Sequence, residues 1–118
     1  MNQTNLIKSQ IVFYVFVAKS DFLIERDVNI LIELGIVGKV SLADFCNVLG
    51  STEVETNDIK QITSKVQLYR NRITSLVKKG YIVKEGKEIK LSPAFNVVKP
   101  EGDVLLEYSL LYLESKNV

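Results

Sequence analysis

The sequence predicts an α+β domain in which three helices precede a β-hairpin, with an additional segment at each end. Apolar residues recur at helical spacing in three stretches between residues 25 and 79. Two short β-type runs then flank Glu85-Gly86. We therefore divide the chain into a strand-like extension (1–24), a central domain (25–92) and a C-terminal segment (93–118) that packs on the domain or on a partner.

The N-terminal extension contains an apolar run at residues 11–17. Its aromatic and β-branched residues favour a strand, although a helix stays open because a continuous apolar run has no diagnostic period. The run is far too short to cross a bilayer, and no small-residue cleavage site follows it. We therefore expect a core strand and no membrane association.

The first predicted helix covers about residues 25–34. One side carries the apolar stripe Val28, Leu31, Ile32 and Leu34. The other side carries the charged residues Glu25, Arg26, Asp27 and Glu33. We expect Gly35 and Gly38 to end the helix, because glycine is the usual residue just past a helix C-terminus.

The second predicted helix begins after Ser41, a good N-cap, with Asp44 placed as in a capping box. Its apolar residues follow at helical spacing: Leu42, Phe45, Cys46 and Leu49. We expect Gly50 to stop the helix, and the polar residues 51–57 to form a loop.

The third predicted helix gives the clearest periodic pattern. It starts between residues 57 and 64 and ends at Gly80, after Lys78 and Lys79, whose charges suit a helix C-terminus. Its stripe is expected to pack on the two preceding helices and consists of Ile62, Val66, Tyr69, Ile73, Leu76 and Val77.

The hairpin is predicted to pair residues 81–84 with residues 88–91, with Glu85-Gly86 at the tip. Tyr81 and Val83 share one face of the first strand, and Ile89 and Leu91 share one face of the second. Farther on, residues 104–113 fit a helix or a strand equally well. They are too apolar to remain free in water, so they pack on the core or on a partner.

The composition excludes most catalytic chemistry. The chain has no histidine, which removes the commonest general base and metal ligand, and no paired carboxylates stand out. Cys46 is the only cysteine, so no intramolecular disulfide forms, and we interpret it as a buried core residue. We therefore expect a cytoplasmic, non-enzymatic protein without a cofactor.

The order of elements resembles a known family. Residues 72–82, Arg-Ile-Thr-Ser-Leu-Val-Lys-Lys-Gly-Tyr-Ile, and the charged hairpin ending in Ile-Lys-Leu-Ser-Pro look like the winged helix-turn-helix of the bacterial multiple-antibiotic-resistance-type regulators. The resemblance implies a recognition helix, a β-hairpin wing and binding of double-stranded DNA. It also implies a bacterial or phage transcriptional regulator.

The third helix presents polar side chains opposite its apolar stripe. We expect Ser64, Gln67 and Asn71 to contact bases, because their groups can bond base edges. Residues 58–90 hold nine Lys or Arg against three acids, a net charge of +6, whereas the whole chain carries only +1. We expect the following residues to contact the DNA backbone: Lys60, Arg70, Arg72, Lys78, Lys84 and Lys87.

A second interpretation is an adaptor or structural winged helix that binds other proteins in a viral or multi-subunit assembly. The low net charge and the mixed charges at the hairpin tip favour it. Residues 11–17 and 104–113 would then bind a second copy or another protein. The N-terminal strand also departs from the terminal dimerisation helices of the regulators.

Overall fold

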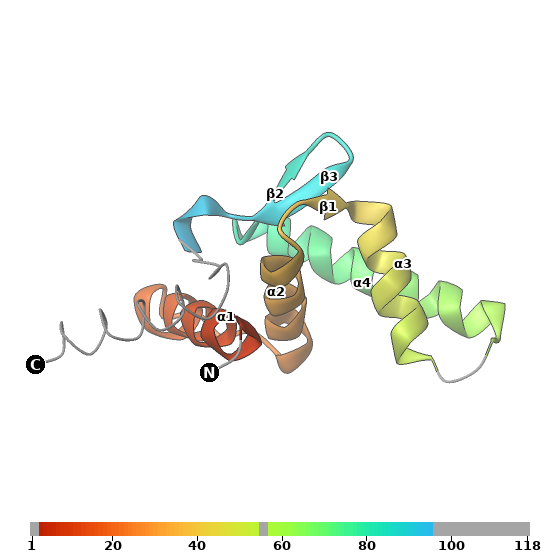
Figure 1. Ribbon diagram of the computed structural model, residues 1–118, viewed down its shortest axis with the longest axis horizontal. Helices are drawn as coiled ribbons and strands as arrows, with labels where there is room; N and C mark the ends of the chain where they lie inside the picture. Colours follow the sequence, from red (N-terminus) through yellow and green to blue (C-terminus); the bar gives the residue numbers. More distant parts are fainter. Residues whose placement is uncertain (1–2, 55–56, 96–118) are drawn as a thin grey trace, which may run out of the picture.

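The computed structural model describes residues 3–54 and 57–95, which fold as an α+β unit (Figure 1). Helices and a small antiparallel sheet share one hydrophobic core. The elements run in the order α1 (Gln3–Val12), the π-helical segment η1 (Phe13–Ala18), α2 (Glu25–Val37), β1 (Val40–Ser41), α3 (Leu42–Glu53), α4 (Ile59–Lys78), β2 (Ile82–Glu85), β3 (Glu88–Leu91) and the 3₁₀ turn η2 (Pro93–Phe95).

The prediction of a strand at residues 11–17 is wrong, because this run continues α1 and forms η1. The helical period becomes visible only when residues upstream of the run are included. Ile7, Ile11 and Val15 recur at steps of four and are fully buried in the core. The N-terminal segment packs against α2 and so belongs to the same core as residues 25–92.

Two glycines that we expected to end helices lie inside them. Gly35 is within α2, which ends three residues later at Gly38 with φ of 91°. Gly50 is within α3, which continues to Glu53. A Cβ on Gly35 would stand 2.9 Å from Ile7 Cγ2, and one on Gly50 would stand 2.7 Å from Val66 Cγ2. Both glycines therefore permit close contact between helices.

Helix α4 is the longest element and crosses behind α3 in Figure 1. It begins at the N-cap Asp58, whose side chain accepts a hydrogen bond from the Lys60 backbone N–H at 2.9 Å, and it ends before Gly80, as predicted. Ile73 and Leu76 are buried, whereas Ile62, Val66 and Tyr69 are half-buried. The predicted N-cap of α3 is also confirmed, because Ser41 Oγ accepts from the Asp44 backbone N–H at 3.4 Å.

The sheet has the order β1-β3-β2 and is antiparallel throughout. The hairpin exists, but its turn lies one residue later than predicted: Glu85 pairs with Glu88, so Gly86 and Lys87 form the loop. Gly86 has φ of 64°, as the first position of such a tight turn requires. Ile82 rather than Val83 is buried with Ile89, since a shift of one residue exchanges the faces of a strand.

Strand β1 was not predicted. It places Val40 opposite Ile89 and Ser41 opposite Glu88. The backbone N–H of Leu42, the first residue of α3, donates to the Lys87 carbonyl at 2.9 Å. The start of α3 is therefore fixed beside the hairpin loop. The predicted segment 104–113 lies outside the described residues.

Candidate nucleic-acid interface

One side of α4 is polar and open to solvent. Ser64, Gln67 and Asn71 are all exposed there, on successive turns of the helix. Gln67 Nε2 donates to Asn71 Oδ1 at 2.8 Å. The pair therefore leaves Gln67 Oε1 free to accept a hydrogen bond and Asn71 Nδ2 free to donate one, which are the two functions that the edge of an adenine requires.

Within α4 and the β2–β3 hairpin, five basic side chains make no ion pair with any described acid. Two of them stand near the ends of α4, one lies in its middle, and two belong to the hairpin. Most other described cations are paired with carboxylates, as in Arg26–Glu53 and Lys79–Asp21. The five unpaired cations of this zone are Lys60, Arg70, Lys78, Lys84 and Lys87.

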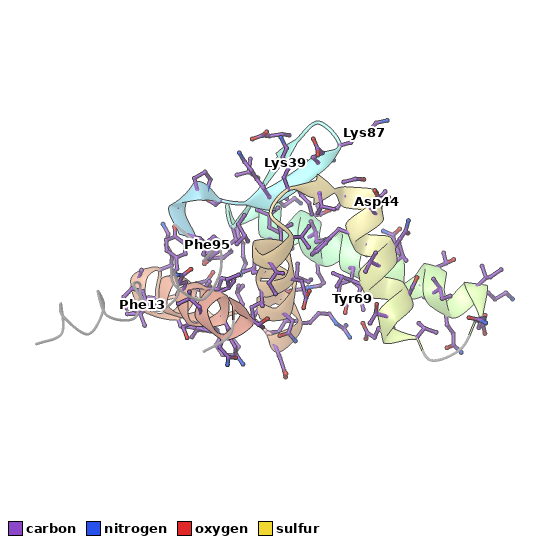
Figure 2. The ribbon with its side chains drawn as sticks, in the orientation of Figure 1. Phe13, Lys39, Asp44, Tyr69, Lys87 and Phe95 are labelled. Carbon is purple, nitrogen blue, oxygen red and sulfur yellow. The ribbon has the colours of Figure 1, made fainter. Side chains whose placement is uncertain are left out.

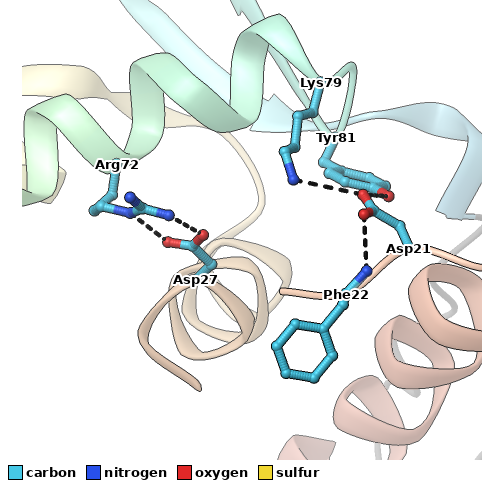
Figure 3. A network of polar contacts seen from close by, with 6 residues as sticks. All are labelled: Asp21, Phe22, Asp27, Arg72, Lys79 and Tyr81. Carbon is cyan, nitrogen blue, oxygen red and sulfur yellow. Dashed lines mark hydrogen bonds and ion pairs between the residues drawn. The ribbon is translucent and has the colours of Figure 1, made fainter. Parts of the chain in front are cut away.

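Arg72 is placed differently from the other five predicted backbone contacts. Its guanidinium makes a two-pronged ion pair with Asp27 of α2, with Nε 2.8 Å from Oδ1 (Figure 3). Asp27 is only 3% exposed, so this pair is a structural link between α2 and α4. The placement of Asp27 on the charged side of α2 was wrong. Its spacing of four and seven residues from Leu31 and Leu34 could have shown that it faces the core.

The acids of the hairpin are engaged by lysines other than Lys84 and Lys87. Glu85 contacts Lys90 at 2.8 Å and Lys39 at 3.1 Å, and Glu88 lies 3.8 Å from Lys39. The hydrogen bond from Lys90, followed by that from Lys39, lowers the pKa of Glu85 below its usual value. The mixed charge at the tip thus separates into a paired group and two unpaired lysines, one of which, Lys87, projects from the loop in Figure 2.

A shallow hollow of about 240 Å³ joins the hairpin to α3 and α4. Three of the unpaired cations line it, and its floor includes the first turn of α3. The backbone N–H groups of Leu42 and Asp44 already donate to the Lys87 carbonyl and to Ser41 Oγ, so the three cations are the main groups that could attract an anion here. Sequence reasoning missed this hollow, since it depends on β1. Its lining residues are Ser41, Leu42, Ala43, Arg70, Lys84, Gly86 and Lys87.

A second hollow, of about 320 Å³, lies at the start of α4 and is lined by Lys60, Gln61, Ser64 and Lys65. It brings the predicted backbone contact Lys60 beside the predicted base contact Ser64. The predicted base contacts therefore have cations on both sides. Lys60 lies beside Ser64 at the start of α4, and Arg70 and the hairpin lysines lie nearer the C-terminal end of the helix. Such an arrangement can bind a polyanion whose interior carries hydrogen-bonding groups.

The described residues contain no group of three acidic, cysteine or histidine side chains that could hold a metal ion. Cys46 is buried, as predicted, and its burial raises the pKa of the thiol. No helix within residues 3–54 and 57–95 has both the length and the apolar character needed to span a membrane. Comparisons with family models, curated proteins and solved structures give no match to this chain.

Proposed function

We propose that this chain is a winged-helix protein that binds double-stranded DNA and acts as a transcriptional regulator. The observation that carries the proposal is the position of the five unpaired cations. They lie around a neutral polar face on α4, whereas the other cations of α4 and the hairpin, Lys65, Arg72 and Lys90, are paired with acids. The major groove of DNA has the complementary arrangement, because hydrogen-bonding base edges form its floor and negatively charged phosphates line both of its sides.

The fold supports this assignment. In the winged-helix interpretation α2, α3 and α4 are the three helices, α4 is the recognition helix, and the β2–β3 hairpin is the wing. The α4 helix is about 10–12 Å wide with its side chains, which fits a major groove about 12 Å across. Lys60 and Lys78 are separated by 18 residues, or roughly 27 Å along the helix axis, and so can reach backbone on either side of the groove.

The residues divide into two roles. Ser64, Gln67 and Asn71 read base edges in the major groove. The five unpaired cations hold phosphates, and the hollow at the start of α3 receives one phosphate beside Arg70, Lys84 and Lys87. Arg72 would have to leave Asp27 to reach DNA, so the proposal gives it the role of fixing α4 on α2.

Fluorescence anisotropy with a labelled random duplex tests the phosphate role. Arg70→Ala and Lys87→Ala should each weaken binding several-fold, and Lys8→Ala should leave it unchanged. Lys8 is the matched control, because it is an exposed lysine of α1 without an ion pair among the described residues. Equal loss in all three variants, or no binding by the wild type, would contradict the proposal and favour the protein-binding adaptor.

The base-reading role requires a preferred site, which selection from a pool of random duplexes would supply. Asn71→Ala should weaken binding to that site by about 1–3 kcal/mol and relax discrimination at one base pair. Lys87→Ala should weaken preferred and random duplexes equally. If Asn71→Ala behaved like Lys87→Ala, the polar face of α4 would not be the reading surface.

A further inference from the structure

The N-terminal helical segment carries an exposed band of apolar side chains. Phe13 and Val17 lie one turn apart on the outer side of η1 and are 62% and 61% exposed. Phe22, which is 76% exposed, packs edge-on against Phe16 with ring centroids 5.8 Å apart. Four large apolar residues in one place exceed what a surface scattered with single apolar side chains needs, so this band predicts a contact.

Phe95, the last residue that the structure describes, stands at the other edge of this band. Its ring is buried against Tyr14 of η1, with centroids 4.6 Å apart, and against Tyr81 at 5.8 Å. Figure 2 shows Phe95 beside the N-terminal helical segment, whose outer end carries Phe13. Phe95, where the described chain ends, therefore lies next to η1.

The sequence that follows has the composition needed to cover the band. Residues 104–113 read Val-Leu-Leu-Glu-Tyr-Ser-Leu-Leu-Tyr-Leu, in which only Glu107 is charged. Eight residues, 96–103, connect this segment to Phe95 and reach up to roughly 26–29 Å when extended. That reach is sufficient for any position on a six-residue helical segment.

We propose that residues 104–113 fold back onto the band formed by Phe13, Phe16, Val17 and Phe22 of the same chain. A short tether gives the segment a local concentration in the millimolar range, far above that of a second copy at micromolar protein. The segment thereby covers apolar surface that both parties would otherwise expose to water. The contact would lie on the exposed side of η1 that carries Phe13 and Val17.

The contact also has a route to the proposed DNA-binding helix. Phe22 follows Asp21, whose carboxylate accepts a hydrogen bond from Tyr81 Oη at 2.7 Å and lies 3.7 Å from Lys79 Nζ (Figure 3). Lys79 is the C-cap of α4, and Tyr81 follows two residues later with its backbone N–H bonded to the Leu76 carbonyl. The fold-back segment therefore helps to fix the linker that holds this end.

Paramagnetic relaxation tests the proposal on the full chain. A nitroxide is attached at Ser109→Cys in a Cys46→Ala background, and amide signals of ¹⁵N-labelled protein are recorded before and after reduction of the label. We expect the signals of Phe13, Val17 and Phe22 to lose most of their intensity when label and ¹⁵N are in the same molecule. These signals should keep their intensity in a mixed sample, in which the spin label is on molecules without ¹⁵N and the ¹⁵N is in molecules without the spin label.

Two further variants give the control. Val17→Glu should abolish the broadening, whereas Val48→Glu, at a site on α3 that is 64% exposed, should retain it. Broadening in the mixed sample would show that a second copy covers the band, and absence of broadening in both samples would show that the segment lies elsewhere. Either result would overturn the proposal.

Discussion

At the scale of single residues, the helices pack against one another through residues whose structural role cannot be recognised from the local sequence. Glycine is typical of helix ends, yet Gly35 and Gly50 lie inside helices. The absence of a Cβ at these two positions allows α1 to pack closely on α2 and α3 to pack closely on α4. Asp27 has the charge of a surface residue but is buried with Arg72. Local sequence could not show these roles, since each depends on a partner distant in the chain.

Gly50→Ala should destabilise the protein. The added Cβ would stand 2.9 Å from the backbone nitrogen of Val66, which cannot move aside as a side chain could. Overpacking costs about 1–3 kcal/mol, which outweighs the ~1 kcal/mol that alanine gains over glycine within a helix. Urea unfolding measures the difference. Asn47→Ala, at an exposed site of the same helix, is the control, and a Gly50→Ala protein more stable than the wild type would refute the close contact.

Arg72→Ala should destabilise the protein more than the double variant Asp27→Ala/Arg72→Ala. Removing Arg72 alone leaves a carboxylate buried without a counter-ion, a loss that is about 3–5 kcal/mol for fully buried pairs. Arg72 is about one-third exposed, so we expect the lower part of that range. A double-mutant cycle by urea unfolding measures the coupling. Additive losses would show that the two side chains act independently.

At the scale of elements, the sequence predicted α2, α3, α4 and the hairpin, because each shows its own period or turn residues. It did not predict β1, since two residues carry no periodic pattern. It misassigned residues 11–17, because the exposed side of this run is itself apolar, with Phe13 and Val17, so no polar face marks its period. The predicted turn of the hairpin was displaced by one residue. A single glycine between charged residues shows that a turn is present but does not define which residues pair on either side of it.

The link between the N-terminal segment and the end of α4 should weaken in alkali. Burial, together with the hydrogen bond to Asp21, raises the pKa of Tyr81 to about 12, whereas an unfolded tyrosine has a pKa near 10. The folded state therefore holds this proton more tightly, so the contribution is complete below pH 10 and is lost as the pH rises toward 12.

Tyr81→Phe isolates this contribution. The difference in unfolding free energy between wild type and variant should be constant from pH 7 to 9 and then change by on the order of 2 kcal/mol up to pH 12. Chemical denaturation at a series of pH values measures it. A difference that stays constant through pH 12 would mean that the Tyr81 phenol is not held as the structure shows.

At the scale of the whole molecule, charge is segregated. The sequence predicted the basic zone from residues 58–90, and the structure adds which of its cations lack partners. It also gathers Arg70, Lys84 and Lys87 around the start of α3, which sequence spacing could not reveal because α3 begins far from all three in the chain. Whether the zone binds DNA stays a prediction, and salt dependence addresses it directly.

The most direct test is therefore the affinity of the wild-type protein for a random duplex as a function of salt concentration. Each phosphate contact contributes about −0.9 to the slope of log K against log salt. If the five unpaired cations all bind phosphates, the slope should be about −4.5, and its magnitude should decrease by about one unit in Lys87→Ala. A slope near zero, or no measurable binding at low salt, would contradict the proposal that α4 and the hairpin bind DNA.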